Sequence, residues 1–278
     1  MFRSSHLLAA LTVVACLLVF PSVSAAKGKP GGGGGGGGGG ASPTGYDISY
    51  PQCGGTFPSS VLFGIVGVNA GIVYSPNPCL GTGDGASELA WAEQWDGAGA
   101  AILYANTADP GPALSTHWPS GQASPQYCDP AEPDSTACSY DYGWNAAADS
   151  YQDAVDAYIQ IGELQPGATQ TPGSNAWWLD VESANSWESN TANNVADLQG
   201  AVAFLQSQGA GSIGFYASST DWQAITGGTT LFSQLPSWQR GSRREATAQS
   251  YCGTIGVTGG PVTLSQYQSG GLDADVRC

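Results

Sequence analysis

Two acidic side chains one residue apart, Asp180 and Glu182, lie in the segment WWLDVES at residues 177–183. A short apolar run is typical of a buried strand, and buried strands do not readily carry two acids. On a strand, residues i and i+2 point to the same side, with side chains roughly 6–7 Å apart. We therefore expect Asp180 and Glu182 to share one face and to influence each other's ionisation.

Such a pair suits acid and base chemistry. Burial and a like-charged neighbour raise the pKa of one acid, which then keeps its proton near neutral pH. The alternative is that both acids cap the next helix or are simply solvated. The apolar AWWL before them and their place at the end of a predicted strand favour the chemical interpretation.

The elements that would position this pair alternate between strands and helices. Segments rich in β-branched and aromatic residues predict strands at 45–50, 63–69, 100–106, 176–182 and 212–218, with weaker candidates at 235–239, 248–252 and 263–267. Apolar residues at three-to-four spacing predict helices within 86–99, 143–163 and 193–209. This alternation indicates an α/β fold, an irregular (β/α)8-like TIM barrel. The stretch 107–143 predicts a loop insertion after the third strand.

Other polar and aromatic side chains lie at or near the ends of predicted strands. In a parallel barrel the carboxyl ends of the strands meet at one mouth, where the active face lies. We therefore expect a set of further residues to converge on Asp180 and Glu182: Asp47, Asn69, Tyr104, Asn106, Trp187, Tyr216, Gln266 and Tyr267, with Asp273 and Asp275 just beyond the last predicted strand. Asp47 is the further catalytic candidate. The candidates for substrate binding are Asn69, Tyr104, Trp187, Tyr216, Gln266 and Asp273.

The N-terminal region predicts export. Residues 1–26 combine Arg3, an apolar run and small residues suited to cleavage, which is typical of a signal peptide and too short for a spanning helix. A lipoprotein interpretation of VVAC, ending at Cys16, stays open as the less favoured alternative. Residues 27–42, with ten consecutive glycines, predict a flexible linker, and residues 43–278 predict one barrel domain.

Six cysteines follow the predicted signal peptide, and an even number in an exported chain predicts three disulfides. Fifteen pairings are open, and we favour pairing between neighbours: 53–79, 128–138 and 252–278. The only histidines are His6 and His117, and no close CxxC motif is present. We therefore expect neither a metal nor another cofactor.

The charge of the chain restricts its partners. After the glycine run, four arginines stand against all 22 acids, a formal charge of −18. Such a surface repels phosphate backbones and anionic lipid, so we expect no nucleic-acid partner and no membrane partner once the signal is removed. A neutral polysaccharide fits better, and we expect an extracellular monomer.

An ordered set of segments resembles the glycoside hydrolase family 25, the Chalaropsis-type lysozymes. The segments are GYDISYPQ, FGIVGVNAG, AILYANT, LDVE, IGFYASSTDW and LSQYQSGGLDAD, spread over most of residues 45–275. The resemblance implies an irregular barrel that cleaves the β-1,4 bond between N-acetylmuramic acid and N-acetylglucosamine in peptidoglycan.

The resemblance also implies roles for individual residues. Glu182 would be the general acid, and Asp180 would orient or stabilise the substrate's own acetamido group as it attacks the anomeric carbon. Asp47 and Asp273 match the aspartates of the family's first strand and closing motif. Asn69 stands where the family commonly carries an acid, and an amide cannot hold charge. Two alternatives therefore stay open: a barrel that acts on another glycan, and a non-catalytic carbohydrate-binding protein of the cell surface.

Overall fold

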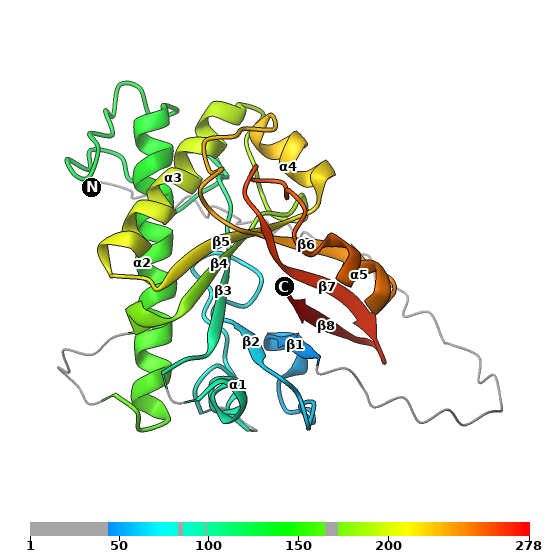
Figure 1. Ribbon diagram of the computed structural model, residues 1–278. Helices are drawn as coiled ribbons and strands as arrows, with labels where there is room; N and C mark the ends of the chain where they lie inside the picture. The colour runs from blue at the N-terminus through cyan, green and yellow to red at the C-terminus, as the bar shows by residue number, and fades with distance from the viewer. Residues whose placement is uncertain (1–43, 83–85, 98, 165–171) are drawn as a thin grey trace, which may run out of the picture. The chain divides into compact units, whose positions relative to one another are not determined.

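The computed structural model describes residues 44–82, 86–97, 99–164 and 172–278, and the predicted signal peptide (1–26) and linker (27–42) lie outside these ranges. Eight strands close a barrel in sequence order (Figure 1). They are β1 (Gly45–Ile48), β2 (Gly64–Gly67), β3 (Ile102–Asn106), β4 (Ala176–Asp180), β5 (Ser212–Ala217), β6 (Ser237–Ser242), β7 (Val262–Ser269) and β8 (Leu272–Arg277). The predicted α/β barrel is confirmed.

The last strand departs from the parallel arrangement. Strands β1 to β7 pair in parallel, whereas β8 runs antiparallel to both β7 and β1. Gly270 and Gly271, with φ of 63° and 87°, form the two-residue turn that this hairpin requires. Asp273 and Asp275 consequently lie on β8, whereas the sequence placed them beyond the last strand.

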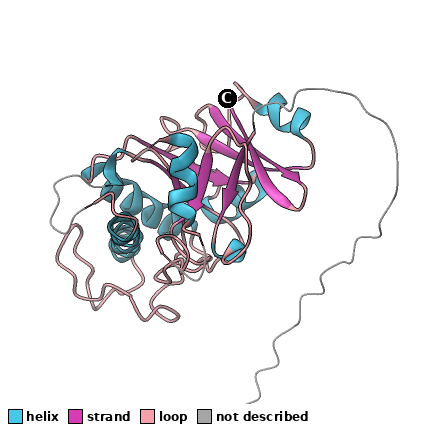
Figure 2. Cartoon of the chain, turned by 90° about the horizontal axis from the view of Figure 1, so that it is seen from below, coloured by secondary structure: helices cyan, strands magenta, loops and turns pink. Residues whose placement is uncertain are grey.

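Five helices accompany the strands: α1 (Glu88–Asp96), α2 (Thr136–Gln160), α3 (Thr191–Ser207), α4 (Ser219–Thr226) and α5 (Glu245–Tyr251). Two short 3-10 turns cover Tyr50–Gln52 (η1) and Pro172–Ser174 (η2). The long helices α2 and α3 lie side by side on one side of the barrel (Figures 1 and 2). They approach closely at Gly143 and Gly200, where a Cβ would meet a backbone oxygen of the other helix at 1.9 Å.

Two sequence predictions are wrong in detail. Helix α2 begins at Thr136, because the Ser135 side chain accepts from the Cys138 amide and caps it, so the loop after β3 ends at 135 and not at 143. The segment 248–252 is not a strand, since α5 covers most of it. A chain leaving β6 must cross back along the barrel before β7 can pair in parallel, and α5 forms part of that crossover.

Alternating side chains divide the core into two layers. Along β4, Trp178 lies in the barrel interior, whereas Trp177 and Leu179 pack under the helices. The interior cluster comprises Phe63, Ile65, Ile102, Trp178, Tyr216, Trp238 and Leu264. Asp180 has the same parity as Trp178, so this alternation directs its carboxyl group inward above the aromatic layer.

Three disulfides fix the loops, and their pairing is the predicted one: Cys53–Cys79, Cys128–Cys138 and Cys252–Cys278. Among the helices of the described ranges, none has the length and apolar character needed to cross a membrane.

Candidate functional site

Four carboxyl groups line one cavity at the mouth of the barrel: Asp47, Asp180, Glu182 and Asp273. This outer space measures about 280 Å³. A deeper space of about 130 Å³ is lined by the same four acids together with Tyr104, Tyr216, Trp238 and Gln266. The acids that were expected to converge at the carboxyl ends of the strands therefore lie around one cavity.

Register explains why these acids meet. Asp180 is the last residue of β4, and Glu182 follows it by two residues. Asp47 on β1 pairs directly with Asp273 on the antiparallel β8. The Asp180 carbonyl is fixed by the Thr107 amide at 3.1 Å and the Thr107 hydroxyl at 2.6 Å.

Asp180 is the buried member of the pair. Its side chain accepts no hydrogen bond from the described residues, and Oδ1 is inaccessible to water. Burial raises the pKa of Asp180 well above its usual value, and the negative charge of Glu182 adds to this, while Arg240 opposes it. The environment therefore favours a protonated Asp180.

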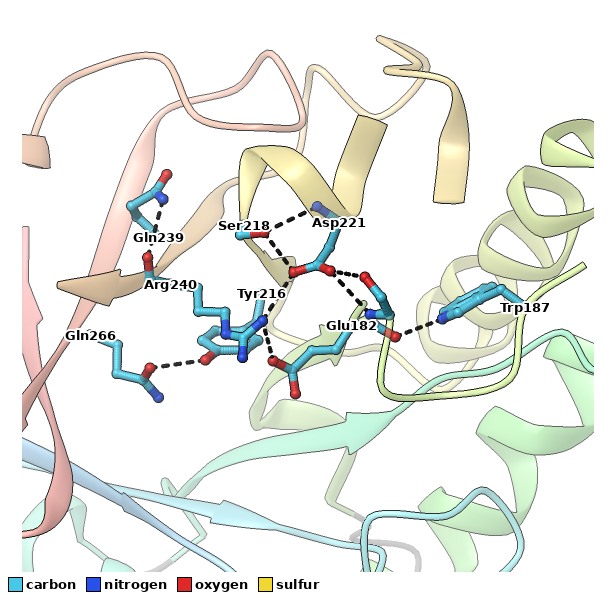
Figure 3. A network of polar contacts seen from close by, with 9 residues as sticks. Glu182, Trp187, Tyr216, Ser218, Asp221, Gln239, Arg240 and Gln266 are labelled. Atoms are coloured by element: carbon cyan, nitrogen blue, oxygen red, sulfur yellow. Dashed lines mark hydrogen bonds and ion pairs between the residues drawn. The ribbon is translucent and has the colours of Figure 1, made fainter. Parts of the chain in front are cut away.

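Glu182 is more open, with its side chain 21% exposed, and it forms an ion pair with Arg240 at 2.8 Å (Figure 3). The pKa of Glu182 is raised overall, because burial and the charges of Asp221 and Asp273 outweigh the lowering effect of the Arg240 charge. The indole nitrogen of Trp187 donates to the Glu182 carbonyl at 2.8 Å. That bond fixes the backbone that carries the acid.

Asp221, on α4, is the second partner of Arg240, at 3.0 Å. Its carboxylate accepts from the Ser183 amide at 3.2 Å, from the Ser183 hydroxyl, and from the Ser218 hydroxyl at 2.5 Å. Burial alone would raise the pKa of Asp221, but these hydrogen bonds and Arg240 outweigh it and lower the pKa. Asp221 is therefore a stable carboxylate.

A second carboxyl pair lies across the mouth. Burial raises the pKa of Asp47 to about 7, and the charge of Asp273 adds to this, while hydrogen bonds from Asp275 and Gln266 oppose it. Asp275 is fully buried and accepts from the Trp238 indole at 2.8 Å. Burial and the neighbouring Asp47 raise the pKa of Asp275 well above its usual value, so Asp275 holds a proton that it can donate to Asp47.

The polar residues predicted from the sequence fall into two groups. Tyr104, Tyr216 and Gln266 line the deeper cavity, and the Tyr216 hydroxyl donates to Gln266 at 2.9 Å. Asn69, Trp187, Tyr267 and Asp275 line neither space. Asn69 instead accepts from the Asn106 amide nitrogen and from its side chain, both at 2.9 Å.

The sequence analysis missed two site residues, Arg240 and Asp221. The predicted strand 235–239 stops one residue short of Arg240. The available signal was charge: three of the four arginines after the glycine run lie at 240–244, next to a strand end, in a strongly acidic domain. Asp221 lay inside the quoted segment IGFYASSTDW without a role.

A further space of about 600 Å³ adjoins the acid cavity, and both are lined by Gly71, Ala184 and Asn185. Its wall includes Leu114 and His117 from the loop after β3, and the His117 ring stacks on Tyr74 with centroids 4.0 Å apart. The mouth therefore continues as a groove along this loop.

The acids of the site do not form a metal centre. Within the described residues, no group of three or more histidine, cysteine, aspartate or glutamate side chains is arranged to hold a metal ion.

Comparisons with known proteins give matches to lysozymes. A family model described as "Lysozyme-like protein 1" matches residues 148–249, a range that contains Asp180, Glu182, Asp221 and Arg240. Two proteins of Dictyostelium discoideum, "Probable GH family 25 lysozyme 4" and "Probable GH family 25 lysozyme 2", are 44% and 43% identical over 61 residues. The match covers 22% of this chain and 28% of each relative.

Solved structures include similar barrels. The muramidases of Trichobolus zukalii and Acremonium alcalophilum are 18% and 16% identical, each with a TM-score of 0.47, and the match covers 85% of this chain and 94% of theirs. A bacterial lysozyme from Streptomyces coelicolor is 15% identical with a TM-score of 0.47, covering 86% of this chain and 93% of that one.

Proposed function

We propose that this chain, a relative of the glycoside hydrolase family 25 lysozymes, is an extracellular glycoside hydrolase that cleaves β-1,4 linkages of a peptidoglycan-type polysaccharide. The observation that carries the proposal is the joint lining of one open cavity by Asp47, Asp180, Glu182 and Asp273. One of these acids, Glu182, reaches solvent, and Asp180 beside it is buried.

Glu182 is the general acid of this proposal. Protonating the glycosidic oxygen removes the need to expel an alkoxide, and a positioned carboxylic acid performs this transfer. Glu182 suits it because its side chain is accessible from the cavity while its backbone is fixed by Trp187.

Asp180 stabilises the acetamido group of the substrate. As the acetamido oxygen attacks the anomeric carbon, positive charge develops on the ring and the acetamide, and an adjacent carboxylate lowers its energy. This substrate-assisted route is an exception to the scheme with two catalytic carboxylates. Asp47 lies across the same cavity and adds negative potential there.

Substrate binding is assigned to the polar cavity wall. Tyr104, Asn106, Tyr216, Gln266 and Asp273 offer hydroxyl, amide and carboxyl groups to sugar hydroxyls. Asn69 acts through Asn106, which it orients. Trp187 contributes indirectly, because its indole nitrogen holds the backbone carbonyl of Glu182.

The setting of the protein follows from its chemistry. Three disulfides favour an oxidising, extracellular compartment. The strongly acidic domain disfavours nucleic acid and anionic membranes as partners. We expect the protein to act as a secreted monomer on the cell wall.

The test is release of reducing ends from insoluble peptidoglycan by the purified full chain. We expect wild type to release them, Glu182→Gln and Asp180→Asn to lose at least 100-fold in kcat, and the exposed control Glu132→Gln to match wild type. No release by wild type would refute peptidoglycan cleavage. Binding without release would then favour the carbohydrate-binding alternative, and release from chitin oligosaccharides alone would favour another glycan.

A further inference from the structure

Arg240 occupies a β-bulge that directs it into the mouth of the barrel. Gln239 pairs with Ser265 and Ser242 pairs with Tyr267, so two residues of β6, Arg240 and Gly241, face one residue of β7. Gly241 has φ of 83°, which glycine adopts without strain. Bulges re-aim side chains next to active sites.

One terminal nitrogen of Arg240 is shared between two carboxylates. Its Nη1 lies 2.8 Å from Oε1 of Glu182 and 3.0 Å from Oδ2 of Asp221 (Figure 3). The Arg240 side chain is 41% exposed, and it contacts Glu182, which lines the cavity.

The two carboxylates hold Arg240 unequally. Asp221 is held by hydrogen bonds from Ser183 and Ser218, which do not depend on the position of Arg240. The Glu182 side chain has no partner other than Arg240 in the part of the chain that the structure describes. Arg240 therefore has one rigid partner and one that is free to leave.

This contact conflicts with the acid role of Glu182. A carboxyl group ion-paired to a guanidinium is ionised, whereas Asp180, buried without a hydrogen-bond partner, favours its protonated form. In the empty site the proton is therefore on Asp180, the residue that must be ionised during cleavage. Glu182, which must donate a proton, lacks one.

We propose that Arg240 is a positioning residue that holds Glu182 as a carboxylate in the empty site and binds Asp221 alone once glycan enters. The inference rests on the proposed function. One proton leaves a carboxyl oxygen of Asp180 and one is taken up by a carboxyl oxygen of Glu182, so the pair keeps one proton and one negative charge. Asp180 thereby becomes the carboxylate that faces the acetamido group.

Desolvation by the glycan drives the exchange. A sugar ring over the cavity removes water from Glu182, which raises its pKa, and the glycosidic oxygen accepts a hydrogen bond only from the protonated form. The titratable and charged groups that face the Asp180–Glu182 pair are Asp47 on β1, Tyr104 on β3, Tyr216 on β5, Asp221 on α4, Arg240 on β6 and Asp273 on β8. Arg240 is the only cation among them.

The first experiment measures the Glu182 pKa in the glycan-free full chain by carbon NMR of its side-chain carboxyl, assigned with Glu182→Gln. We expect Arg240→Gln to raise this pKa by about one unit, since a nearby cation is lost at a partly exposed site. Asp221→Asn should lower it, because Asp221 repels the Glu182 charge and competes for Arg240. Shifts in the same direction, or none, would overturn the proposal, and Arg240→Lys should stay close to wild type.

The second experiment uses pH profiles of glycan cleavage. The alkaline limb of kcat/KM reports loss of the proton that the Asp180–Glu182 pair shares in the free enzyme, and that of kcat reports the complex. We expect Arg240→Gln to move the kcat/KM limb to higher pH and to leave the kcat limb in place. Equal movement of both limbs would mean that Arg240 stays on Glu182 in the complex. If wild type cleaves no glycan, the proposed function fails, and the NMR arm still decides whether Arg240 holds Glu182 ionised.

Discussion

At the residue scale, the two neighbouring acids differ because one faces the barrel interior and the other its rim. Asp180 lies above Trp178 and is buried, whereas Glu182 lies beyond the end of β4 and contacts Arg240. Paired carboxyl groups in different environments can take up opposite protonation states. In the proposed mechanism the same two residues provide a proton donor and a charge stabiliser, once glycan has reversed their resting states.

Trp187 tests how far Glu182 depends on its backbone support. Trp187→Phe keeps an aromatic ring but loses the hydrogen bond to the Glu182 carbonyl, worth about 1 kcal/mol. We expect kcat to fall about five-fold with KM near the wild-type value. Steady-state kinetics on soluble oligosaccharide measures both constants.

The control for this variant is Trp118→Phe, which loses an indole hydrogen bond to the Pro133 carbonyl in the loop after β3. It should leave kcat unchanged. If Trp187 instead stacked on a sugar, a phenyl ring would keep most of that contact, and an unchanged kcat in Trp187→Phe would contradict the positioning role.

The acids of the site could be predicted from the sequence alone, whereas Arg240, the cation that contacts Glu182, could not. Asp47, Asp180 and Glu182 follow from the rule that strand ends form the mouth of a barrel. Arg240 depends on a bulge, and a register shift between β6 and β7 leaves little trace in a single sequence. The resemblance to family 25, supported by the lysozyme matches, likewise indicated the acids and gave no role to Arg240.

At the element scale, strands β1, β4, β5 and β6 carry most of the candidate site, and the closing hairpin of β7 and β8 completes it. The turn Gly270–Gly271 reverses the chain so that Asp273 lies beside Asp47. The alternation in LDADVR, which indicates a strand, and the double glycine, which indicates a hairpin turn, are both present in the sequence. They were missed because Asp273 and Asp275 were interpreted as loop residues.

The loop after β3 (107–135) forms one wall of the 600 Å³ groove, and the Cys128–Cys138 disulfide ties its end to α2. Replacing both cysteines by serine should loosen this wall. We expect KM for polymeric substrate to rise several-fold and kcat to change little, because the acids lie on other elements. Kinetics on polymer and on a short oligosaccharide, which does not reach the groove, separates the two effects.

The matched control is the double serine variant of Cys252 and Cys278. The Cys278 amide donates to Thr263 near the start of β7, at the end of the barrel opposite the acid cavity. Both disulfide variants should lose roughly 2–4 kcal/mol of stability. Only the Cys128–Cys138 variant should raise KM, and a rise in both would show a general loss of folded protein.

At the scale of the whole molecule, acids far outnumber bases, and several of them are buried. Burial, as the largest cause, raises the pKa of Asp47, Glu88, Asp109 and Asp153 to about 7 in each case. In the unfolded chain these groups titrate near pH 4. Composition predicted the net charge, but the number of buried acids follows only from the tertiary structure.

Stability should therefore decrease as the pH rises. Between about pH 4 and pH 7 the folded protein binds more protons than the unfolded chain, so the free energy of unfolding falls as pH increases. The stabilisation from these raised pKa values is fully present below about pH 4 and lost above about pH 7. Thermal unfolding of the full chain at pH 4.5, 5.5, 6.5 and 7.5 should show a steady fall in Tm, and a Tm that rises over this range would contradict the assignment.

Asp109 allows a test of one of these buried acids outside the acid cavity. It is fully buried, and the charge of Glu188 adds to the effect of burial on its pKa, while the neighbouring Ser139 hydroxyl and Gly111 amide oppose both. Asn resembles protonated Asp, so Asp109→Asn should match wild type at pH 5 and raise Tm by several degrees at pH 8, where wild type must ionise a buried acid. One kcal/mol corresponds to about 2–4 °C in a domain of this size. The exposed Asp156→Asn should leave the pH slope unchanged, and an Asp109→Asn variant less stable than wild type at pH 8 would mean that Asp109 is needed as a carboxylate.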